Sequence, residues 1–587
     1  MKKLMVFVLA FIITAGAAFA NGSGDAAVTV SQLPRNETLY FNGLQWGAPV
    51  ALSPYHANRN YGFLETHRQV VFETLFLYNP LDITKLYPQI GDSYTWNGNN
   101  VTIVLNKNVK FSDGTPLTAA DVVNSYQLAK EYSTSYSGYW TYINAIRAVD
   151  DYTVVIEGNP TTINPKYIEQ SLSELYISSK KYWDAKKASG ELKKSATALL
   201  EFLGWDCPGT GPYKPIIQDA TKVVVERDDK YWGQHPSRWG KLPAPKYLAM
   251  NIYKDNASGD AAFRAGQVDV SQQFISQVWK ISQSGVPVQT YIPQAPYYLP
   301  GVIPCIVFNT TKPGLSEAVV RQAIAMSLDY NAIGQNAMSG YTAPYVPSLM
   351  LPIPQEQALI DANKLKPYQW SSDLNTARAA ANKLLDDAGW VKGADGIRAK
   401  GGVKLSFKAE CPAGWSDWNA SLEVVSQSAK SISIDIFTYF PDLPIWQSDK
   451  DNTTFDIIMH SPGGFNIASP WSRAYFISSE NISPKGTPNK VHNWGRWQNK
   501  RADEIIKALI TETDKAKQKD LWTELNILYL QEMPIAGLMY RPSRFHTVYT
   551  GVWTGFPQQN DGSNIPPLIC IDGYGIAALY KISAKAK

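Results

Sequence analysis

The chain has 587 residues, too many for one hydrophobic core, since single cores stop growing near about 250–300 residues. At least two domains are therefore expected. Hydrophobic residues make up 44% and charged residues 18%, and the mean hydropathy of −0.23 is typical of a water-soluble globular chain. The formal charge of +4 excludes the strongly basic surface of a nucleic-acid-binding protein. Aromatic residues reach 12%, with 18 Trp, whereas the six His argue against a His-rich metal site.

The first twenty residues have the pattern of a cleavable export signal. Lys2 and Lys3 form a short positive region, residues 4–18 are apolar, and Ala18-Phe19-Ala20 matches a small-x-small cleavage pattern. The apolar run is short for a membrane helix, and no later stretch approaches about 20 apolar residues. No Cys follows Ala20 to carry a lipid anchor, so we expect an unanchored protein in the periplasm.

Four cysteines would be exported with the chain, so disulfides are allowed but not required. They permit three complete pairings, and buried free thiols remain the other interpretation. No C-x-x-C pair is present, which excludes a zinc ribbon or a thioredoxin-like motif. The four are Cys207, Cys305, Cys411 and Cys570.

Predicted strands and helices alternate along the chain, which indicates α/β domains. Strands are predicted at residues 38–41, 101–105, 403–407, 432–436 and 455–459. Apolar residues at helical spacing predict helices at residues 68–77, 316–328, 375–388, 500–509 and 515–530. A further helix begins at Thr118, which forms a capping box with Asp121. Gly389 is expected to end the helix at 375–388.

Seven short sequences occur in an order that resembles the oligopeptide/dipeptide family of ABC-transporter solute-binding proteins, family 5. The most specific of them is residues 105–123, LNKNVKFSDGTPLTAADVV. The others are residues 71–78 (VFETLFLY), 209–213 (GTGPY), 308–309 (FN), 320–325 (VRQAIA), 395–398 (DGIR) and 493–497 (NWGRW). Gly114, Gly209 and Gly211 are expected to set turns that need unusual backbone angles.

The resemblance implies an α/β fold of the periplasmic-binding-protein type II, with two lobes hinged around a cleft and an extra third domain, class (cluster) C. Lobe I is expected to comprise residues 21–60, 205–295 and 545–587. The extra domain II would be residues 61–204, and lobe II residues 296–544. The resemblance also implies a monomer that closes around a small-molecule ligand and delivers it to the permease subunits of an ABC importer. It implies no catalytic residue, cofactor or resident metal.

The loop after the strand at 455–459 bears on the ligand. In peptide-binding members this place carries an Asp that pairs with the α-ammonium of the peptide. Here it reads HSPGGFNIASPW over residues 460–471, and no acidic residue occurs between 457 and 479. Phe465, Asn466 and Trp471 offer flat apolar surfaces and an amide instead, which suits hydroxyl groups.

A second loop, CPAGWSDWN over residues 411–419, joins a strand to a helix, the position where α/β lobes usually bind ligands. Trp415, Asp417 and Trp418 are its candidate contacts, and Ser416 is a candidate N-cap. Indole faces stack on the C–H face of a β-linked pyranose. With the missing ammonium anchor, this loop resembles the cellobiose-type, β-oligosaccharide-binding branch of the family.

Further candidate ligand contacts are Trp46 after the first strand, Trp205 before the GTGPY turn, and Arg496, for which holding the turn at 493–497 is the favoured alternative. An oligopeptide-binding protein is the alternative, and it would need an acid from elsewhere. A secreted glycoside hydrolase, with Asp206 and Asp417 as carboxylates, is a remote alternative. The family landmarks belong to a non-catalytic fold, so we expect no enzyme. The six His form no close metal-ligand pair, which argues against nickel or haem binding.

Overall fold

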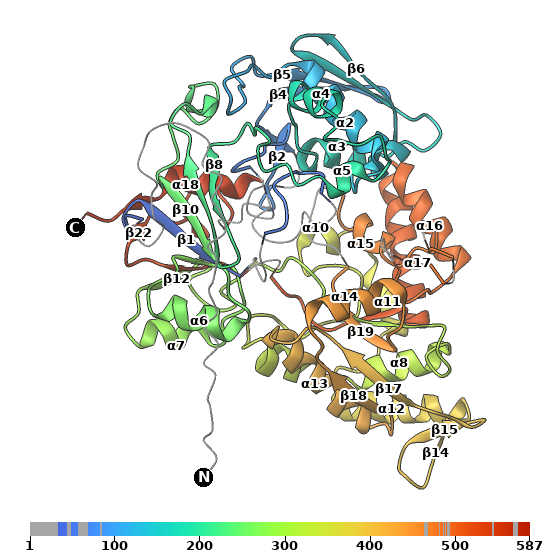
Figure 1. Ribbon diagram of the computed structural model, residues 1–587. Coiled ribbons are helices and arrows are strands. Elements are labelled where there is room, and N and C mark those ends of the chain that lie inside the picture. The colour runs from blue at the N-terminus through green and yellow to red at the C-terminus, as the bar shows by residue number, and fades with distance from the viewer. Residues whose placement is uncertain are drawn as a thin grey trace, which may run out of the picture. The chain divides into compact units, whose positions relative to one another are not determined.

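The structure is a computed structural model, shown in Figure 1. It describes residues 33–43, 49–56, 69–82, 85–462, 468–480, 482–484, 486–487, 489, 493–542, 545–567 and 573–586. The export signal, Trp46, Phe465, Asn466 and Cys570 lie outside the described residues. Within the described part, no helix combines the length and the apolarity that a membrane crossing requires.

A seven-stranded mixed sheet is built from three separate stretches of the chain. Its central strand β1 (Thr38–Asn42) is parallel to both neighbours, β10 (Tyr247–Asn251) and β11 (Val270–Ser271). The remaining strands are β9 (Lys222–Arg227) and β8 (Tyr213–Gln218) beyond β10, and β21 (Thr547–Tyr549) and β12 (Val288–Thr290) beyond β11. Helices α6 (Asn256–Arg264) and α7 (Val278–Gln283) belong to the same part of the chain (Figure 1). These stretches lie in the segments expected for lobe I.

A four-stranded antiparallel sheet lies in the segment expected for the extra domain. Its order is β4 (Gly91–Asn97), β5 (Asn100–Leu105), β7 (Thr153–Gly158) and β6 (Ile143–Asp150). Helices α2 (Ala119–Glu131), α3 (Pro165–Glu174), α4 (Lys180–Ala188) and α5 (Ala198–Glu201) accompany it. Its apolar side chains share one buried core with those of the seven-stranded sheet, Val101 and Leu39 among them.

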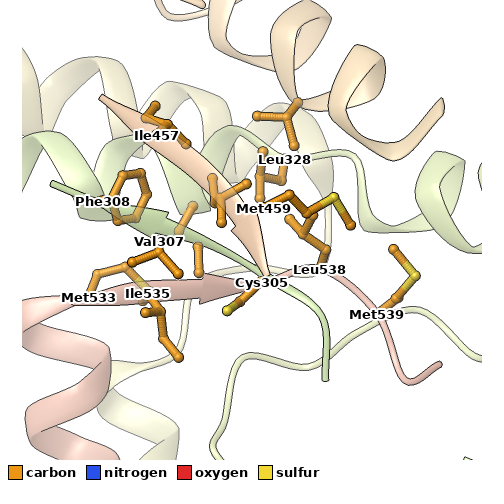
Figure 2. Close-up of a cluster of buried hydrophobic side chains, with 14 of the residues drawn as sticks. Cys305, Val307, Phe308, Leu328, Ile457, Met459, Met533, Ile535, Leu538 and Met539 are labelled. Atoms are coloured by element: carbon orange, nitrogen blue, oxygen red, sulfur yellow. The ribbon is translucent and has the colours of Figure 1, made fainter. Parts of the chain in front are cut away.

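The third sheet has five strands in the order β18 (Asp435–Tyr439), β17 (Ser406–Glu410), β19 (Ile457–His460), β13 (Cys305–Phe308) and β20 (Ile535–Gly537). β17 is parallel to both β18 and β19, whereas β13 is antiparallel to β19 and β20. Figure 2 shows the apolar side chains of β13, β19 and β20 packed together, Val307, Met459 and Ile535 among them. They belong to a second buried core, separate from the first.

Two helices connect the three parallel strands of this sheet. α13 (Ser416–Lys430) joins β17 to β18, and α14 (Leu443–Asn452) joins β18 back to β19. The first connection moves one way across the sheet and the second moves back, so right-handed crossovers place the two helices on opposite faces. The carboxyl ends of β17 and β19 therefore lie at a topological switch point, where ligands of α/β domains bind.

The other helices of this part of the chain surround the five-stranded sheet and its small three-stranded neighbour, β14 (Val391–Lys392), β15 (Arg398–Lys400) and β16 (Val403–Lys404). The helices are α8 (Ala318–Ser327), α9 (Tyr330–Ala332), α10 (Pro354–Gln357), α11 (Ala362–Leu365), α12 (Leu374–Asp387), α15 (Trp471–Tyr475), α16 (Lys500–Thr511) and α17 (Lys515–Glu532). Two strand pairs and a helix complete the fold: β2 (Phe76–Tyr78) with β3 (Leu86–Pro88), β22 (Trp553–Thr554) with β23 (Ser583–Ala584), and α18 (Ala578–Lys581).

Two segments that run between the seven- and five-stranded sheets pair with each other. Val302 N donates to Arg541 O at 2.9 Å, and Arg541 N returns the bond to Val302 O at 3.0 Å. Val302 precedes β13 and Arg541 follows β20, so both crossovers are held at one place. A pair of crossovers of this kind is a candidate hinge.

Most predicted elements are confirmed, but three predictions are wrong. Residues 69–78 form a turn and the short strand β2, not a helix. Gln69 has a φ of +67°, and Gly211 N and Tyr213 N bond to the carbonyls of Val71 and Val70 at 2.9 and 2.8 Å. These contacts with a distant segment override the local helical spacing.

The second correction concerns the glycines of the GTGPY turn. Gly114 has the expected positive φ of +86°, but Gly209 and Gly211 do not have positive φ. They are required by close approach instead, since a Cβ on Gly209 would lie 1.9 Å from Val71 O. The third correction is the N-cap of α13, which is Trp415 and not Ser416.

Candidate ligand-binding site

The corner between β17 and α13 carries the predicted indoles. Gly414 has a φ of +78°, which turns the chain before Trp415. The Trp415 ring meets the ring of Trp418 edge-on at 5.1 Å between centroids and lies 5.9 Å from that of Trp446. Trp415 is half-buried, whereas Trp418 and Trp446 are buried. Trp415 is therefore the indole of this corner that keeps exposed surface.

Asp417 is buried in the first turn of α13. Its Oδ2 accepts a hydrogen bond from Arg541 Nε at 2.5 Å, and the guanidinium also lies 4.5 Å from the centre of the Phe545 ring. The acid beside Trp415 is thus neutralised by a cation on the crossover segment. Sequence reasoning missed Arg541, since nothing local relates position 541 to position 417.

A line of rings continues from Trp415 along the face of the sheet under α14. Trp446 of α14 stacks on His460 at the end of β19, with centroids 5.4 Å apart and planes 7° apart. His460 in turn lies 4.4 Å from Trp494. Lys450 Nζ lies over both indoles, 4.4 Å from the centre of Trp494 and 5.4 Å from that of Trp446. Burial lowers the pKa of Lys450.

Glu410 ends β17 next to this line of rings. Its register with Ile458 places its side chain on the same face as His460. The side chain is fully buried, and neither carboxylate oxygen accepts a hydrogen bond, although Lys408 Nζ lies 3.5 Å from Oε1. Burial raises the pKa of Glu410 to about 7, with Lys408 opposing the shift and Asp449 adding to it.

Sequence reasoning did not select Glu410, Trp446, His460 or Trp494 as candidates. Trp446 and Lys450 lie four residues apart on one helix and share a face, and this spacing is the local signal that could have linked them. The other members lie on separate elements, and only the sheet register and the path of α14 bring them together.

Trp471 begins α15 and is buried where α15 packs against α16 and α3. Its Nε1 donates to Ile506 O at 2.7 Å, and its ring stacks on Tyr475 with centroids 4.8 Å apart. The ring also meets Tyr167 of α3, in the segment expected for the extra domain, edge-on at 4.8 Å. These surroundings give Trp471 a packing role.

The remaining described candidates lie outside the aromatic corner. Trp205 is 43% exposed, and its neighbour Asp206 binds Tyr182 Oη at 2.6 Å and Lys186 Nζ at 2.9 Å, both from α4. Arg496 has a φ of +58° and donates to Ser483 O at 2.8 Å, so it holds its own turn. Trp46, Phe465 and Asn466 are not among the described residues.

The seven-stranded sheet also reaches the corner. Asn256, the first residue of α6, donates through Nδ2 to Ser416 Oγ at 2.9 Å, and its backbone oxygen accepts from Gln273 Nε2 at 2.6 Å. Ser416 follows Trp415 directly. Gln273, just after β11, is therefore linked through Asn256 to the corner at the end of β17. Nowhere in the described ranges do three or more His, Cys, Asp or Glu side chains gather as a metal site.

Comparison with solved structures supports this architecture. The chain superposes with a TM-score of 0.84 on a mannohexaose-bound periplasmic oligopeptide-binding protein from Thermotoga maritima, at 25% identity over 95% of this chain and 100% of that one. The oligopeptide-binding protein AppA from Bacillus subtilis, bound to a nonapeptide, gives a TM-score of 0.69 at 17% identity, over 94% of this chain and 99% of that one, and shows the fold alone. The type II fold with an added domain is thereby confirmed.

Curated relatives are similarly named binding proteins. The oligopeptide-binding protein OppA of Bacillus subtilis is 22% identical over 78% of each chain. The probable peptide-binding protein YejA of Agrobacterium fabrum is 23% identical over 47% of this chain, and the match spans 45% of that protein, less than half its length. Both relatives are named as binding proteins, which agrees with the prediction that this chain is a solute-binding protein.

A family model covers residues 85–484, more than two-thirds of the chain, and its description is bacterial extracellular solute-binding proteins, family 5 Middle. The match runs through the four-stranded sheet, part of the seven-stranded sheet, and β17, β18 and β19 with the aromatic corner. The chain therefore belongs to the family 5 bacterial extracellular solute-binding proteins.

Proposed function

We propose that this family 5 solute-binding protein binds a β-linked, cellobiose-like oligosaccharide in the periplasm for an ABC importer. The ligand would lie between the ends of β17 and β11 and be enclosed by movement at the paired crossovers. The protein would act as a monomer and pass the sugar to membrane permease subunits. No cofactor enters this function.

The observation that carries the proposal is the line of rings that starts at half-buried Trp415 and continues through Trp446 to His460. An indole face is the negative side of its quadrupole and attracts the polarised C–H bonds of a pyranose face. The adjoining acid, Asp417, is already paired with Arg541, so this corner is not arranged to meet a ligand cation. Asn256, close to Trp415 through Ser416, supplies an amide, which suits hydroxyl groups.

Two further observations support a sugar. The chain lacks acids between residues 457 and 479, where peptide-binding members carry their ammonium anchor. In addition, the structural relative with mannohexaose bound matches this chain over 95% of its length.

An oligopeptide remains the second candidate, because several relatives are named oligopeptide-binding proteins. Glu410 is the buried acid that such a ligand would require. The two candidates predict different ligands for the same cleft.

Thermal unfolding and intrinsic Trp fluorescence, measured with cellobiose, laminaribiose, mannobiose, mannohexaose and a tripeptide mixture, test the proposal. A sugar at 100 times its Kd should stabilise the protein by roughly 2.7 kcal/mol. Stabilisation by the peptides alone would refute the sugar assignment. Release of monosaccharide during long incubation would instead point to a hydrolase.

A further inference from the structure

Four buried polar groups around the line of rings make no hydrogen bond. They are both carboxylate oxygens of Glu410, Nε1 of Trp446, Nε1 of Trp494 and Oγ of Ser461. The Glu410 side chain is fully buried, and Trp446 and Trp494 are only 4% and 5% exposed. Buried polar groups in folded proteins are nearly always satisfied, so a group of four requires a physical explanation.

The four groups lie in one part of the fold although they come from four elements. Glu410 ends β17 and Ser461 follows β19, its neighbour in the sheet. Trp446 and Trp494 both contact the ring of His460, which precedes Ser461. Trp446 and Trp494 thus flank His460, and Glu410 and Ser461 lie at the carboxyl ends of the two neighbouring strands, at the switch point where a ligand of this fold is expected.

The chemistry of the four groups is complementary to a hydroxyl. Each indole N–H can only donate, an ionised carboxylate can only accept, and a serine hydroxyl can do both. One sugar hydroxyl could accept a hydrogen bond from an indole N–H and donate one to Glu410. It would thereby satisfy a donor and an acceptor at once. Lys408 is 3.5 Å from Glu410 Oε1, a longer separation than a good charge-assisted hydrogen bond, so the carboxylate retains capacity to accept.

A ligand ammonium fits this place poorly. It has no acceptor for the two indole N–H groups, so these would stay unpaired. It would also meet two cations already present, Lys408 beside Glu410 and Lys450 over the faces of Trp446 and Trp494. The arrangement therefore favours a neutral, hydroxyl-bearing group over a peptide terminus.

We propose that Glu410, Trp446, Trp494 and Ser461 form a deep subsite that receives the terminal ring of the oligosaccharide whose preceding ring stacks on Trp415. This inference rests on the proposed function and adds to it the residues that fix the end of the ligand. Trp415 is 5.9 Å from Trp446 between ring centroids, so the subsite continues directly from the stacking surface.

Two conservative variants test the subsite. Trp446→Phe keeps an aromatic ring but removes the N–H, and Glu410→Gln keeps the shape but removes the charge. Isothermal titration with cellobiose and with mannohexaose should show at least about tenfold weaker binding for Glu410→Gln, since hydrogen bonds to charged groups are worth about one to two factors of ten. Trp446→Phe loses a hydrogen bond between neutral groups, so its binding should weaken by about two- to tenfold. Trp239→Phe is the matched control, because Trp239 Nε1 is also buried and unbonded but its ring stacks on Tyr580 at 4.4 Å, away from the corner. Its affinity should stay within about twofold.

A second measurement keeps the test independent of how the variants fold. In protein with ¹⁵N-labelled Trp, the indole N–H resonances of Trp446 and Trp494, assigned by their loss in Phe variants, should shift when the sugar is added. The Trp239 resonance should not move.

The outcomes separate this inference from the proposed function. If Trp446→Phe and Glu410→Gln bind the sugars like wild type while Trp415→Ala weakens binding, the subsite is refuted and the sugar function stands. If the wild-type protein binds neither sugar and binds tripeptides, the proposed function fails first. Unmoved indole resonances on addition of a sugar that binds would assign the four groups to internal water and overturn the subsite.

Discussion

Arg541 donates a hydrogen bond through Nε to Asp417 Oδ2 at 2.5 Å, which ties the crossover segment after β20 to the first turn of α13. Asp417 is 2% exposed at its side chain and Arg541 18%. The pair therefore fixes the corner that carries Trp415 to a candidate hinge. A change in the geometry of the crossover would therefore move the indole of Trp415.

Asp417→Ala should destabilise the protein by about 3–5 kcal/mol, because it leaves the Arg541 charge largely buried without its partner. Urea unfolding measures the effect, and a double-mutant cycle with Arg541→Ala isolates the coupling. The control is Glu524→Gln, which breaks the exposed pair of Arg501 with Glu524 and should cost below about 1 kcal/mol. Equal effects of the two acid substitutions would contradict a special role for Asp417.

Trp415 and Trp471 should respond differently to truncation. Trp415→Ala removes a half-buried indole from the proposed stacking surface, so sugar affinity should fall while the protein stays folded. Trp471→Ala removes a buried ring that contacts Tyr167 and Tyr475, so unfolding stability should fall by about 3–5 kcal/mol. Sequence reasoning expects lost affinity from both.

The exposed Trp205 supplies the control for this pair, since Trp205→Ala should change stability by less than about 0.5 kcal/mol. Chemical denaturation and titration with cellobiose are both needed. A Trp471→Ala protein that unfolds like wild type would show that its contact with α3 adds nothing to stability.

The pH dependence of stability should report on Glu410. Its pKa is raised from 4.5 to about 7 by burial in the folded state, beside Lys408 and Asp449. A carboxyl with a raised pKa holds its proton more tightly when folded, so the free energy of unfolding falls as pH rises between these two values. The contribution of one group has a slope of at most about 1.4 kcal/mol per pH unit.

Glu410→Gln should therefore gain stability relative to wild type as pH rises from about 4.5 to about 7, and keep that gain above pH 7. Urea unfolding at several pH values measures the difference. The pKa of buried Glu73 is also raised to about 7, so both proteins retain its contribution and only the difference between them is diagnostic. Parallel stability curves would show that Glu410 does not titrate in this window.

The elements that sequence predicted well are those determined by local chemistry. Thr118 and Asp121 form the expected capping box at α2, with Thr118 N donating to Asp121 Oδ2 at 2.8 Å. Gly389 follows α12 with the left-handed φ of +81° that ends a helix. Caps and helix ends depend on residues three or four positions apart, so the sequence contains the whole signal.

Features that depend on distant contacts were predicted less well. Residues 69–78 have helical spacing but are held by backbone bonds to Gly211 and Tyr213. Gly209 is required because it approaches Val71, a contact that the sequence does not reveal. The family landmarks nevertheless predicted the type II fold, because their order over most of the chain is itself long-range information.

The candidate site divides in the same way. Trp415 and Trp418 follow from a strand-to-helix corner, which a sequence can show. Glu410 and Trp446 join them through sheet register and the return of α14, which it cannot. The sequence therefore predicts a site at the carboxyl end of β17, but it does not predict which polar groups beneath α14 adjoin that site.

The described cysteines should be unreactive in the folded protein. Cys207, Cys305 and Cys411 are buried free thiols. Burial raises the pKa of Cys411 to about 12 and raises the pKa values of Cys207 and Cys305 above their ordinary range. The thiolate is the reactive species, so at about pH 8 each of these groups is protonated as well as inaccessible.

Cys570 is outside the described residues, so the Cys570→Ser variant isolates the other three. An aromatic disulfide reagent should label none of them within minutes at about pH 8, and should label all three once guanidinium chloride unfolds the chain. The same labelling with and without a reducing agent would show free thiols, since a reducing agent adds reactive groups only where a disulfide is present.

Rapid labelling of a single thiol in the folded variant would show local opening. Cys411 lies four residues before Trp415, so it is the thiol that a movement of this corner would expose. Protection of Cys411 on addition of sugar would then connect that opening to the ligand.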